Sequence, residues 1–470
     1  MHFAKTKQDF HTMPNHPLTV KPLALATLFL ASLPISAFAC GVTDKPPVKK
    51  IPSNYIAASN NQCLIYKFLQ DDAVKSVTWT GECKDGYASG HGIATWFDGE
   101  NKPILRVDTE LDHGDMNKKA IMDWEQENGC EYKHMETDMR DNKQRGHAVI
   151  EFTDGNKYVG ESNDPNVPNK GVFTWGKGSQ WSGDRYEGQF LNGIRDGYGV
   201  YTSGIYTDWV NQGIDFKTAK FNNPTDFDDY EGFRYEGQWK AGNKDGKGKF
   251  YSKDFNYEGD WVDDQKNGNG VGYWPGKKAT YEGQWKNDQP NGKGKLTTEE
   301  LRYEGDFIDG NRHGHGVYYL YKENSKYEGE WKDDQTNGKG MLTRNDDKWY
   351  QWYQGDFQHS KISGKGELHL ASGTVAVGSF IGGYVWGFNT VTVPKPAYDN
   401  PKAKRTPSLG KWVDPNTYVE QGWFFNDKLV FNCKSEQDCY KIAKTDPVKN
   451  KFIKDTEKKR EYFELNSTLD

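Results

Sequence analysis

Short segments in which aromatic and polar residues alternate recur along the middle of the chain. Residues 235–239 read Tyr-Glu-Gly-Gln-Trp. Side chains two positions apart share one face of a strand, so Tyr235, Gly237 and Trp239 are expected on one face and the polar residues between them on the other. This alternation predicts a short β-strand with one aromatic face.

A second alternating segment follows the first. After residues 235–239 comes a polar stretch that ends in Asp245-Gly246, and then residues 247–250, which read Lys-Gly-Lys-Phe. Asp-Gly and Asn-Gly pairs favour tight hairpin connections, because these residues tolerate positive φ. The two segments therefore predict a β-hairpin whose connection ends at Asp245-Gly246.

The hairpin pattern is repeated. In the clearest run, from Gly237 to Gly355, the first glycines of successive units lie 22 to 26 residues apart. Periods of this length are typical of arrays in which each unit buries its apolar face only against its neighbours. A strand glycine packs nothing itself, so its recurrence indicates close approach by another group, most simply an aromatic ring. A second glycine follows the first after nine residues at these places: Gly81/Gly90, Gly188/Gly197, Gly237/Gly246, Gly259/Gly268, Gly283/Gly292, Gly305/Gly314, Gly329/Gly338, Gly355/Gly364 and Gly378/Gly387.

Tyr-Glu-Gly-x-Trp/Phe, a polar loop and Gly-x-Gly together resemble the membrane occupation and recognition nexus (MORN) repeat. Seven units between Tyr186 and about Leu370 match closely, and segments near Trp79, Tyr158 and Val375 match less well. The resemblance implies an all-β fold, an elongated and twisted array of stacked antiparallel β-hairpins, that serves as an interaction scaffold and carries no activity. The aromatic residues of the repeat face are expected to pack over the glycines rather than to bind a ligand: Tyr235, Trp239, Tyr257, Trp261, Tyr281, Trp285, Tyr303, Phe307, Tyr327 and Trp331.

The N-terminal residues predict export. The stretch from Leu23 to Ala39 is mostly apolar, follows Lys21 and ends before Cys40, which is typical of a secretory signal, whether translation starts at Met1 or at Met13. A small residue before Cys40 resembles a bacterial lipobox, which implies lipidation of Cys40; a soluble secreted or periplasmic form is the alternative. The Pro- and Lys-rich residues that follow are typical of an extended tether.

The six cysteines bear on the same question. An even set favours disulfides in an oxidising compartment, whereas lipidation of Cys40 leaves five. Cys433 and Cys439 flank a short polar loop, and Cys63 and Cys83 bracket a hairpin-sized stretch, so these two pairs are the disulfide candidates. Cys130 is then the odd thiol.

The chain is expected to divide as follows: a signal peptide (1–39), a tether (40–60), divergent hairpins (61–180), the repeat array (181–393) with a diverged or inserted segment at about 204–233, a linker (394–410), and a C-terminal element with a capping strand and a helix (411–470). Ile442, Ile453 and Phe463 are placed to dock this short helical tail on the array.

Composition excludes several functions. The net charge is −6, and the lysines alternate with Asp and Glu, so nucleic-acid binding is not expected. No phosphate-binding loop, nucleophile motif or zinc spacing is present. We therefore expect no enzyme activity, no cofactor and no metal site; His313 and His315 are interpreted as solvated.

Two functions remain. The first is a non-catalytic scaffold that binds another protein at the bacterial cell envelope, anchored to the membrane if Cys40 is acylated. The second is a glycan-binding module, which requires that the rows of Tyr and Trp face solvent. Exposure of Trp239, Trp261, Trp285 and Trp331 separates the two hypotheses.

Overall fold

A computed structural model describes residues 54–68, 74–125, 132–163, 169–179, 181–211, 232–345, 350–399 and 409–466. The chain forms two compact units. Strands β1 to β16 belong to the first unit, and β18 to β30 belong to the second. Strand β17 (Gln265–Trp274) and the short 3-10 helix η1 (Pro275–Lys277) contribute residues to both.

The first unit consists of hairpins and one short helix. Its elements are β1 (Tyr55–Ala57), β2 (Leu64–Tyr66), β3 (Ser76–Trp79), β4 (Glu82–Lys84), β5 (Tyr87–Phe97), β6 (Pro103–Asp112), β7 (Asp115–Trp124), β8 (Tyr132–Arg140), β9 (Lys143–Phe152), β10 (Lys157–Glu161), β11 (Asn169–Thr174), β12 (Arg185–Leu191), β13 (Ile194–Thr202), α1 (Gly204–Asn211), β14 (Phe233–Lys240), β15 (Asn243–Ser252) and β16 (Asn256–Val262).

The second unit continues with hairpins and ends in helices. Its elements are β18 (Ala279–Lys286), β19 (Gln289–Thr297), β20 (Leu301–Ile308), β21 (Asn311–Leu320), β22 (Ser325–Lys332), β23 (Gln335–Arg344), β24 (Tyr350–Gln358), β25 (Lys361–Leu370), β26 (Val375–Ile381), β27 (Tyr384–Pro394), α2 (Lys395–Tyr398), β28 (Lys411–Asp414), β29 (Thr417–Phe425), β30 (Lys428–Asn432), α3 (Glu436–Ala443) and α4 (Pro447–Asn466).

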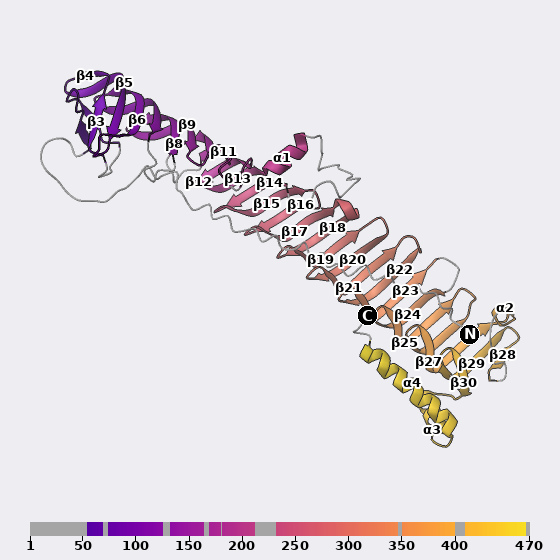
Figure 1. The fold of residues 1–470 in the computed structure, drawn as a ribbon. Coiled ribbons are helices and arrows are strands. Elements are labelled where there is room, and N and C mark those ends of the chain that lie inside the picture. Colours follow the sequence, from indigo (N-terminus) through magenta and orange to yellow (C-terminus); the bar gives the residue numbers. More distant parts are fainter. Residues whose placement is uncertain are drawn as a thin grey trace. The chain divides into compact units, whose positions relative to one another are not determined.

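Within each unit the strands follow one another as an antiparallel meander (Figure 1). From β5 to β16, and again from β18 to β27, each described pairing joins a strand to its sequence neighbour. The predicted fold, an array of antiparallel hairpins with C-terminal helices, is confirmed. Each hairpin needs only its neighbours to complete its core.

A tyrosine ring lying over two paired glycines is the recurring structural unit. Gly237 of β14 stands opposite Gly248 of β15, and Tyr235 covers both. A Cβ atom added to Gly237 would lie 2.6 Å from the Tyr235 hydroxyl, and one added to Gly248 would lie 2.5 Å from the ring carbon Cζ. The two glycines have no side chains, and the tyrosine ring fills the space that side chains would otherwise occupy. This packing explains why both positions are glycine.

The hairpin turns lie earlier than the sequence analysis placed them. The chain reverses at Ala241-Gly242, and Gly246 lies inside β15 with φ +96°. Between the paired positions Gly237/Gly248 and Trp239/Lys244, three residues of β15 face the single residue Gln238 of β14. The prediction of a connection ending at Asp245-Gly246 was wrong, because this glycine permits a β-bulge rather than the turn itself.

The bulge is held by a side chain. The Gln238 Oε1 atom accepts a hydrogen bond of 2.9 Å from the backbone N–H of Lys247. The same contact, between the residue after the first glycine and the residue nine positions later, recurs in six more of the described hairpins: Glu161 with Lys170, Gln189 with Tyr198, Gln284 with Lys293, Asp306 with His315, Glu330 with Lys339, and Asp356 with Lys365.

Before the regular hairpins, the first unit has a different core. Strands β6 to β9 carry small or unbranched residues at the positions where the later repeats carry glycines and aromatic rings. Thr109 pairs with Ala120, Thr137 pairs with Ala148, and Met122 pairs with Met135. These side chains are buried. Methionine adapts to irregular spaces, which suits a stretch without the repeat's ring packing.

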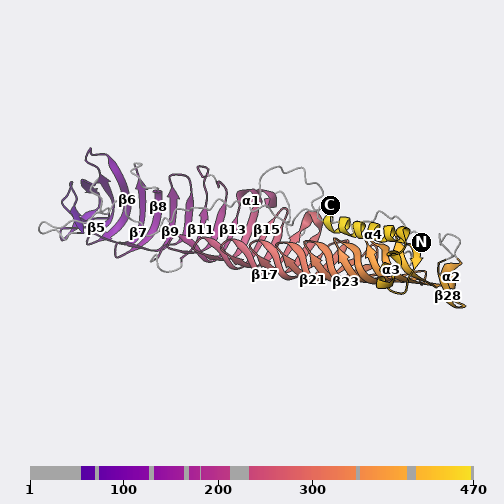
Figure 2. The same ribbon diagram turned by 90° about the horizontal axis from the view of Figure 1, so that it is seen from below.

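Helices α3 and α4 cover one face of the last strands of the second unit (Figure 2). Trp423, Phe431, Cys439 and Ile453 form the buried cluster between helices and sheet, and the Trp423 Nε1–H donates to the Thr456 hydroxyl at 3.2 Å. Ile453 therefore docks as the sequence analysis expected. Of the segment expected at 204–233, the described part begins with helix α1; residues 212–231 lie outside the described residues, as do 400–408 of the expected linker.

We predict that Gly294→Ala destabilises the second unit by about 1 to 3 kcal/mol, because the new methyl group would lie 2.5 Å from the Tyr281 ring carbons Cε2 and Cζ. Urea unfolding followed by tryptophan fluorescence measures the change. Gly276→Ala in η1 is the matched control, since nothing lies within 4 Å of its added Cβ. Equal midpoints for the two variants would contradict the ring-over-glycine packing.

Candidate functional site

The aromatic face of the hairpins is a buried core. Trp239, Trp261, Trp285 and Trp331 are only 4 to 6% exposed. The motif tyrosines Tyr235, Tyr257, Tyr281, Tyr303 and Tyr327 and the ring of Phe307 are 0 to 2% exposed. We call this side the covered face.

Each motif tyrosine is fixed by a hydrogen bond inside its own hairpin. The Tyr235 hydroxyl donates to the Gln238 carbonyl oxygen at 2.9 Å. Burial raises the pKa of these phenols, so they remain donors at any physiological pH. The same bond, to the carbonyl three residues later, is made by Tyr158, Tyr186, Tyr257, Tyr281, Tyr303, Tyr327 and Tyr353.

Each motif tryptophan connects its hairpin to the preceding one. The Trp331 Nε1–H donates to the Gly316 carbonyl oxygen at 3.3 Å, and Trp239 donates to Gly199 at 3.2 Å. The Tyr303 ring meets the Trp331 ring edge to face, with centroids 5.2 Å apart. The covered face is thus a ladder of T-shaped pairs, and each pair contributes about 0.5 to 1.5 kcal/mol beyond its buried area.

Buried cations complete this ladder beside several tryptophans. Arg312 lies 4.5 Å from the Trp331 ring centroid and pairs with Asp334 at 2.9 Å, and Arg195 lies 4.4 Å from the Trp239 ring. Burial lowers the pKa of Arg195, whose guanidinium nevertheless donates to the Gly242 carbonyl. These cations were not predicted from the sequence, although a basic residue recurs two positions before the second glycine of several repeats.

Burial of the rings weakens the glycan-binding hypothesis. Stacking on a sugar requires an open ring face, and the motif Tyr and Trp rings are packed against glycine backbone and one another. The interaction surface must therefore be sought on the opposite side of the sheet.

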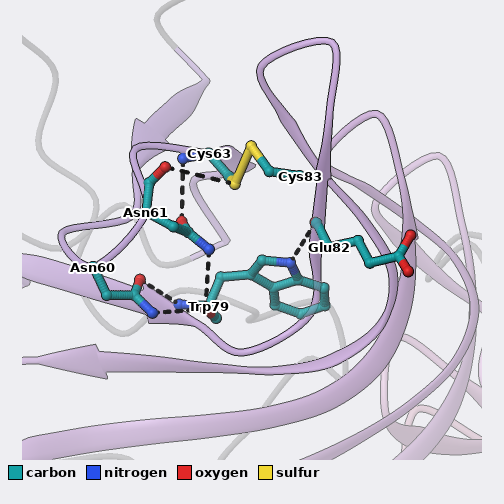
Figure 3. Close-up of a disulfide and its surroundings, with 6 residues drawn as sticks. All are labelled: Asn60, Asn61, Cys63, Trp79, Glu82 and Cys83. Carbon is teal, nitrogen blue, oxygen red and sulfur yellow. Dashed lines mark hydrogen bonds between the residues drawn. A yellow bond between two sulfur atoms is a disulfide. The ribbon is translucent and has the colours of Figure 1, made fainter.

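The structure joins Cys63 to Cys83, whose Cα atoms are 5.7 Å apart, near the start of the first unit (Figure 3). Beside it, the amides of Asn60 and Asn61 donate to the Trp79 carbonyl at 2.7 and 3.2 Å. The Trp79 indole donates to the Glu82 carbonyl at 2.9 Å, three residues later, as the motif tyrosines do. Trp79 thus takes the tyrosine's role in this first repeat.

A second disulfide joins Cys433 to Cys439 between β30 and α3. It lies in the buried cluster under the C-terminal helices. The remaining candidate, Cys40, and the odd thiol Cys130 lie outside the described residues.

The opposite side of the sheet, which we call the open face, carries charged side chains in rows. Lys247 pairs with Asp260 of the next strand at 2.5 Å, and Lys293 pairs with Asp306 at 2.6 Å. Within strands, Arg234 pairs with Glu236 at 2.7 Å. Exposed pairs of this kind contribute roughly 0 to 1 kcal/mol each, so stability does not explain the rows.

A shallow groove of about 840 Å³ lies on the open face of β21 to β26. Its floor is glycine backbone, and its walls include His315, Glu328, Lys339, Met341 and Val377. A smaller groove of about 570 Å³ in the first unit is lined by Lys170, Glu187 and Tyr198.

Exposed apolar side chains lie on the open face near the C-terminal helices. Met341 and Val377 are 39% and 46% exposed there. The residue before the motif tyrosine is polar in six repeats, and in the repeat of Tyr353 it is Trp352. The Trp352 ring stacks on His369 with centroids 3.7 Å apart. Those six residues are Arg185, Arg234, Asn256, Thr280, Arg302 and Lys326. Trp352 was not predicted as a surface residue of interest from the sequence, although aligning the repeats shows it as the departure.

In the part of the chain that the structure describes, no group of three or more His, Cys, Asp or Glu side chains is placed to hold a metal ion. His315 lies on the open face and His313 is 3.6 Å from Asp333. Among the described helices, none is long and apolar enough to cross a membrane.

The geometry defines an antiparallel hairpin-repeat protein. Comparison with known families then identifies the repeat: the MORN repeat matches residues 79–100, 186–207, 235–256, 257–276, 281–299, 303–324, 327–347 and 353–375. The chain is a MORN repeat protein over these segments, as its motifs indicated. The hairpin of Tyr158 lies outside the matched segments but has the same hydrogen bond and glycine pairing. No curated protein matches the chain.

We predict a pH-dependent contribution from His134 in β8. Its Nδ1 lies 2.6 Å from an Asp123 oxygen, a hydrogen bond that raises the His134 pKa above its ordinary 6.5 despite the opposing effect of burial. This stabilisation is therefore complete below pH 6.5 and is lost as the pH rises through the folded-state pKa. His134→Gln should destabilise the first unit at pH 5.5 by at most about 1 kcal/mol, and by less at pH 8.5.

Urea unfolding at the two pH values measures the difference. His147→Gln, which removes an exposed histidine from the adjacent strand β9, is the control. A His134→Gln effect that grows with pH would contradict the assignment.

Proposed function

We propose that this chain is a non-catalytic, exported repeat scaffold of the bacterial cell envelope that binds another protein through the open face. The observation that carries the proposal is the division of the two faces. The covered face uses its rings and glycines for the core, whereas the open face presents ordered charges and a groove that stability does not require.

The family supports a binding role. MORN repeats are generally protein-interaction repeats and are typically non-catalytic, and no catalytic family matches this chain. Exposed hydrophobic side chains rimmed by polar ones, as around Met341 and Val377, are typical of protein interaction sites.

Export is supported by the cysteines and the N-terminal residues. The described part of the chain contains two disulfides, and disulfides persist in oxidising compartments. The apolar stretch from Leu23 to Ala39 and the following Cys40 support a signal sequence and a lipid anchor, with a periplasmic or secreted form as the alternative.

In-cell crosslinking tests the scaffold proposal. The full chain with its native signal, carrying a photo-crosslinking residue in place of Lys247, Lys293 or Lys339 on the open face, should give one reproducible envelope protein by mass spectrometry. The same residue in place of Trp285 on the covered face is the control and should give none. Absence of any protein adduct, together with retention of the chain on cell-wall polysaccharide, would overturn the proposal in favour of glycan binding.

A further inference from the structure

Helix α4 shows how a helix lies on the open face. Phe452 contacts Phe425 of β29 with ring centroids 5.5 Å apart, and Thr456 accepts from Trp423 of the same strand. One turn later, Arg460 lies by Gly387 of β27, and Phe463 lies by Gly382 in the turn between β26 and β27. The helix therefore crosses the strands, with contacts recurring about once per helical turn.

This crossing has a simple geometric basis. One α-helical turn rises about 5.4 Å, and neighbouring strands are about 4.8 Å apart. A helix laid across the sheet therefore places successive turns over successive strands. Side chains four residues apart, which share one face of the helix, then meet equivalent positions of neighbouring strands.

The face next to this contact is open. Lys361, at the start of β25, lies 5.8 Å from the Phe463 ring, and the groove lies on the open face of β21 to β26. Its exposed row runs Glu328, Met341, Gln354, Glu367, Val377 in paired register across β22 to β26. Met341 and Val377 are the apolar members of this row, and Trp352, which stands where six other repeats have a polar residue, lies beside it.

We infer that this groove binds an amphipathic α-helix of a partner protein, laid across the strands in the manner of α4. The inference rests on the proposed scaffold function and names the kind of partner. Continuity of the surface with the α3–α4 contact favours a helix over an extended strand, because the groove lies on the face of the sheet and not at a strand edge.

Charge indicates the composition of that helix. Glu436 of α3 pairs with Lys365 on the open face at 3.0 Å. Lys339 occupies the equivalent position one hairpin earlier and is 71% exposed, although it pairs with Asp356. A partner helix with an apolar stripe for Met341, Val377 and Trp352, and with acidic residues along its flank for Lys339, therefore fits this surface. Six strands at about 4.8 Å span roughly 24 Å, which is about 16 helical residues.

The test uses a displayed library of 18-residue amphipathic helices, and a second library of the same composition in which the helical periodicity is scrambled. Both are selected on the full chain. Amphipathic sequences with acidic flanks should be enriched, and chosen peptides should gain helicity on binding by circular dichroism. The triple variant Met341→Lys, Trp352→Arg, Val377→Glu, which restores residue types found at these positions in other units, should bind them at least 10-fold more weakly.

The control is Glu282→Gln with Lys295→Gln, on the open face outside the groove, which should leave binding unchanged; circular dichroism and thermal melting verify the fold of both variants. Equal enrichment from the scrambled library would overturn the inference. So would unchanged peptide binding to the triple variant, or a triple variant that loses binding to cell-wall polysaccharide but not to the peptides. If the peptide selection fails but the in-cell experiment gives a protein adduct, the helical partner is rejected and the scaffold proposal is retained.

Discussion

The packing of one tyrosine ring over two paired glycines is the constraint on which the repeats depend. In the hairpin of β14 and β15, the Tyr235 ring occupies the space beside Gly237 and Gly248, and its hydroxyl caps the Gln238 carbonyl. The tryptophan two positions after the first glycine then reaches back to the preceding hairpin. Each hairpin repeat therefore packs its own core and contacts only the neighbouring repeat, so the array can extend without contacts between distant repeats.

The covered face was predictable because its signals are local. Alternation with a period of two places Tyr235 and Trp239 on one side, and glycine spacing marks each hairpin regardless of the rest of the chain. The turn positions were not predictable in the same way. Asp245-Gly246 has the composition of a turn, but the Gln238 side chain caps the Lys247 N–H and converts that glycine into part of a bulge, which leaves the reversal at Ala241-Gly242.

The open face was the hardest part to predict. Which charged residues pair depends on strand register and side-chain reach, and Arg234 pairs with Glu236 of its own strand rather than across the sheet. The position of α3 and α4 depends on long-range contacts such as Trp423 with Thr456, which leave no periodic signal. Aligning the repeats with one another does reveal Trp352 as a departure, because six other repeats have a polar residue at its position.

The two faces thus have separate roles: one carries the fold, and the other is free to carry recognition. Hydroxyl-radical footprinting of the folded chain, read by peptide mass spectrometry and normalised to the denatured chain, tests this division most directly. The account predicts protection of Trp239, Tyr303 and Trp331 and strong oxidation of Tyr198 and Met341, which are 53% and 39% exposed. Oxidation of the motif tryptophans at rates similar to Tyr198 would contradict it.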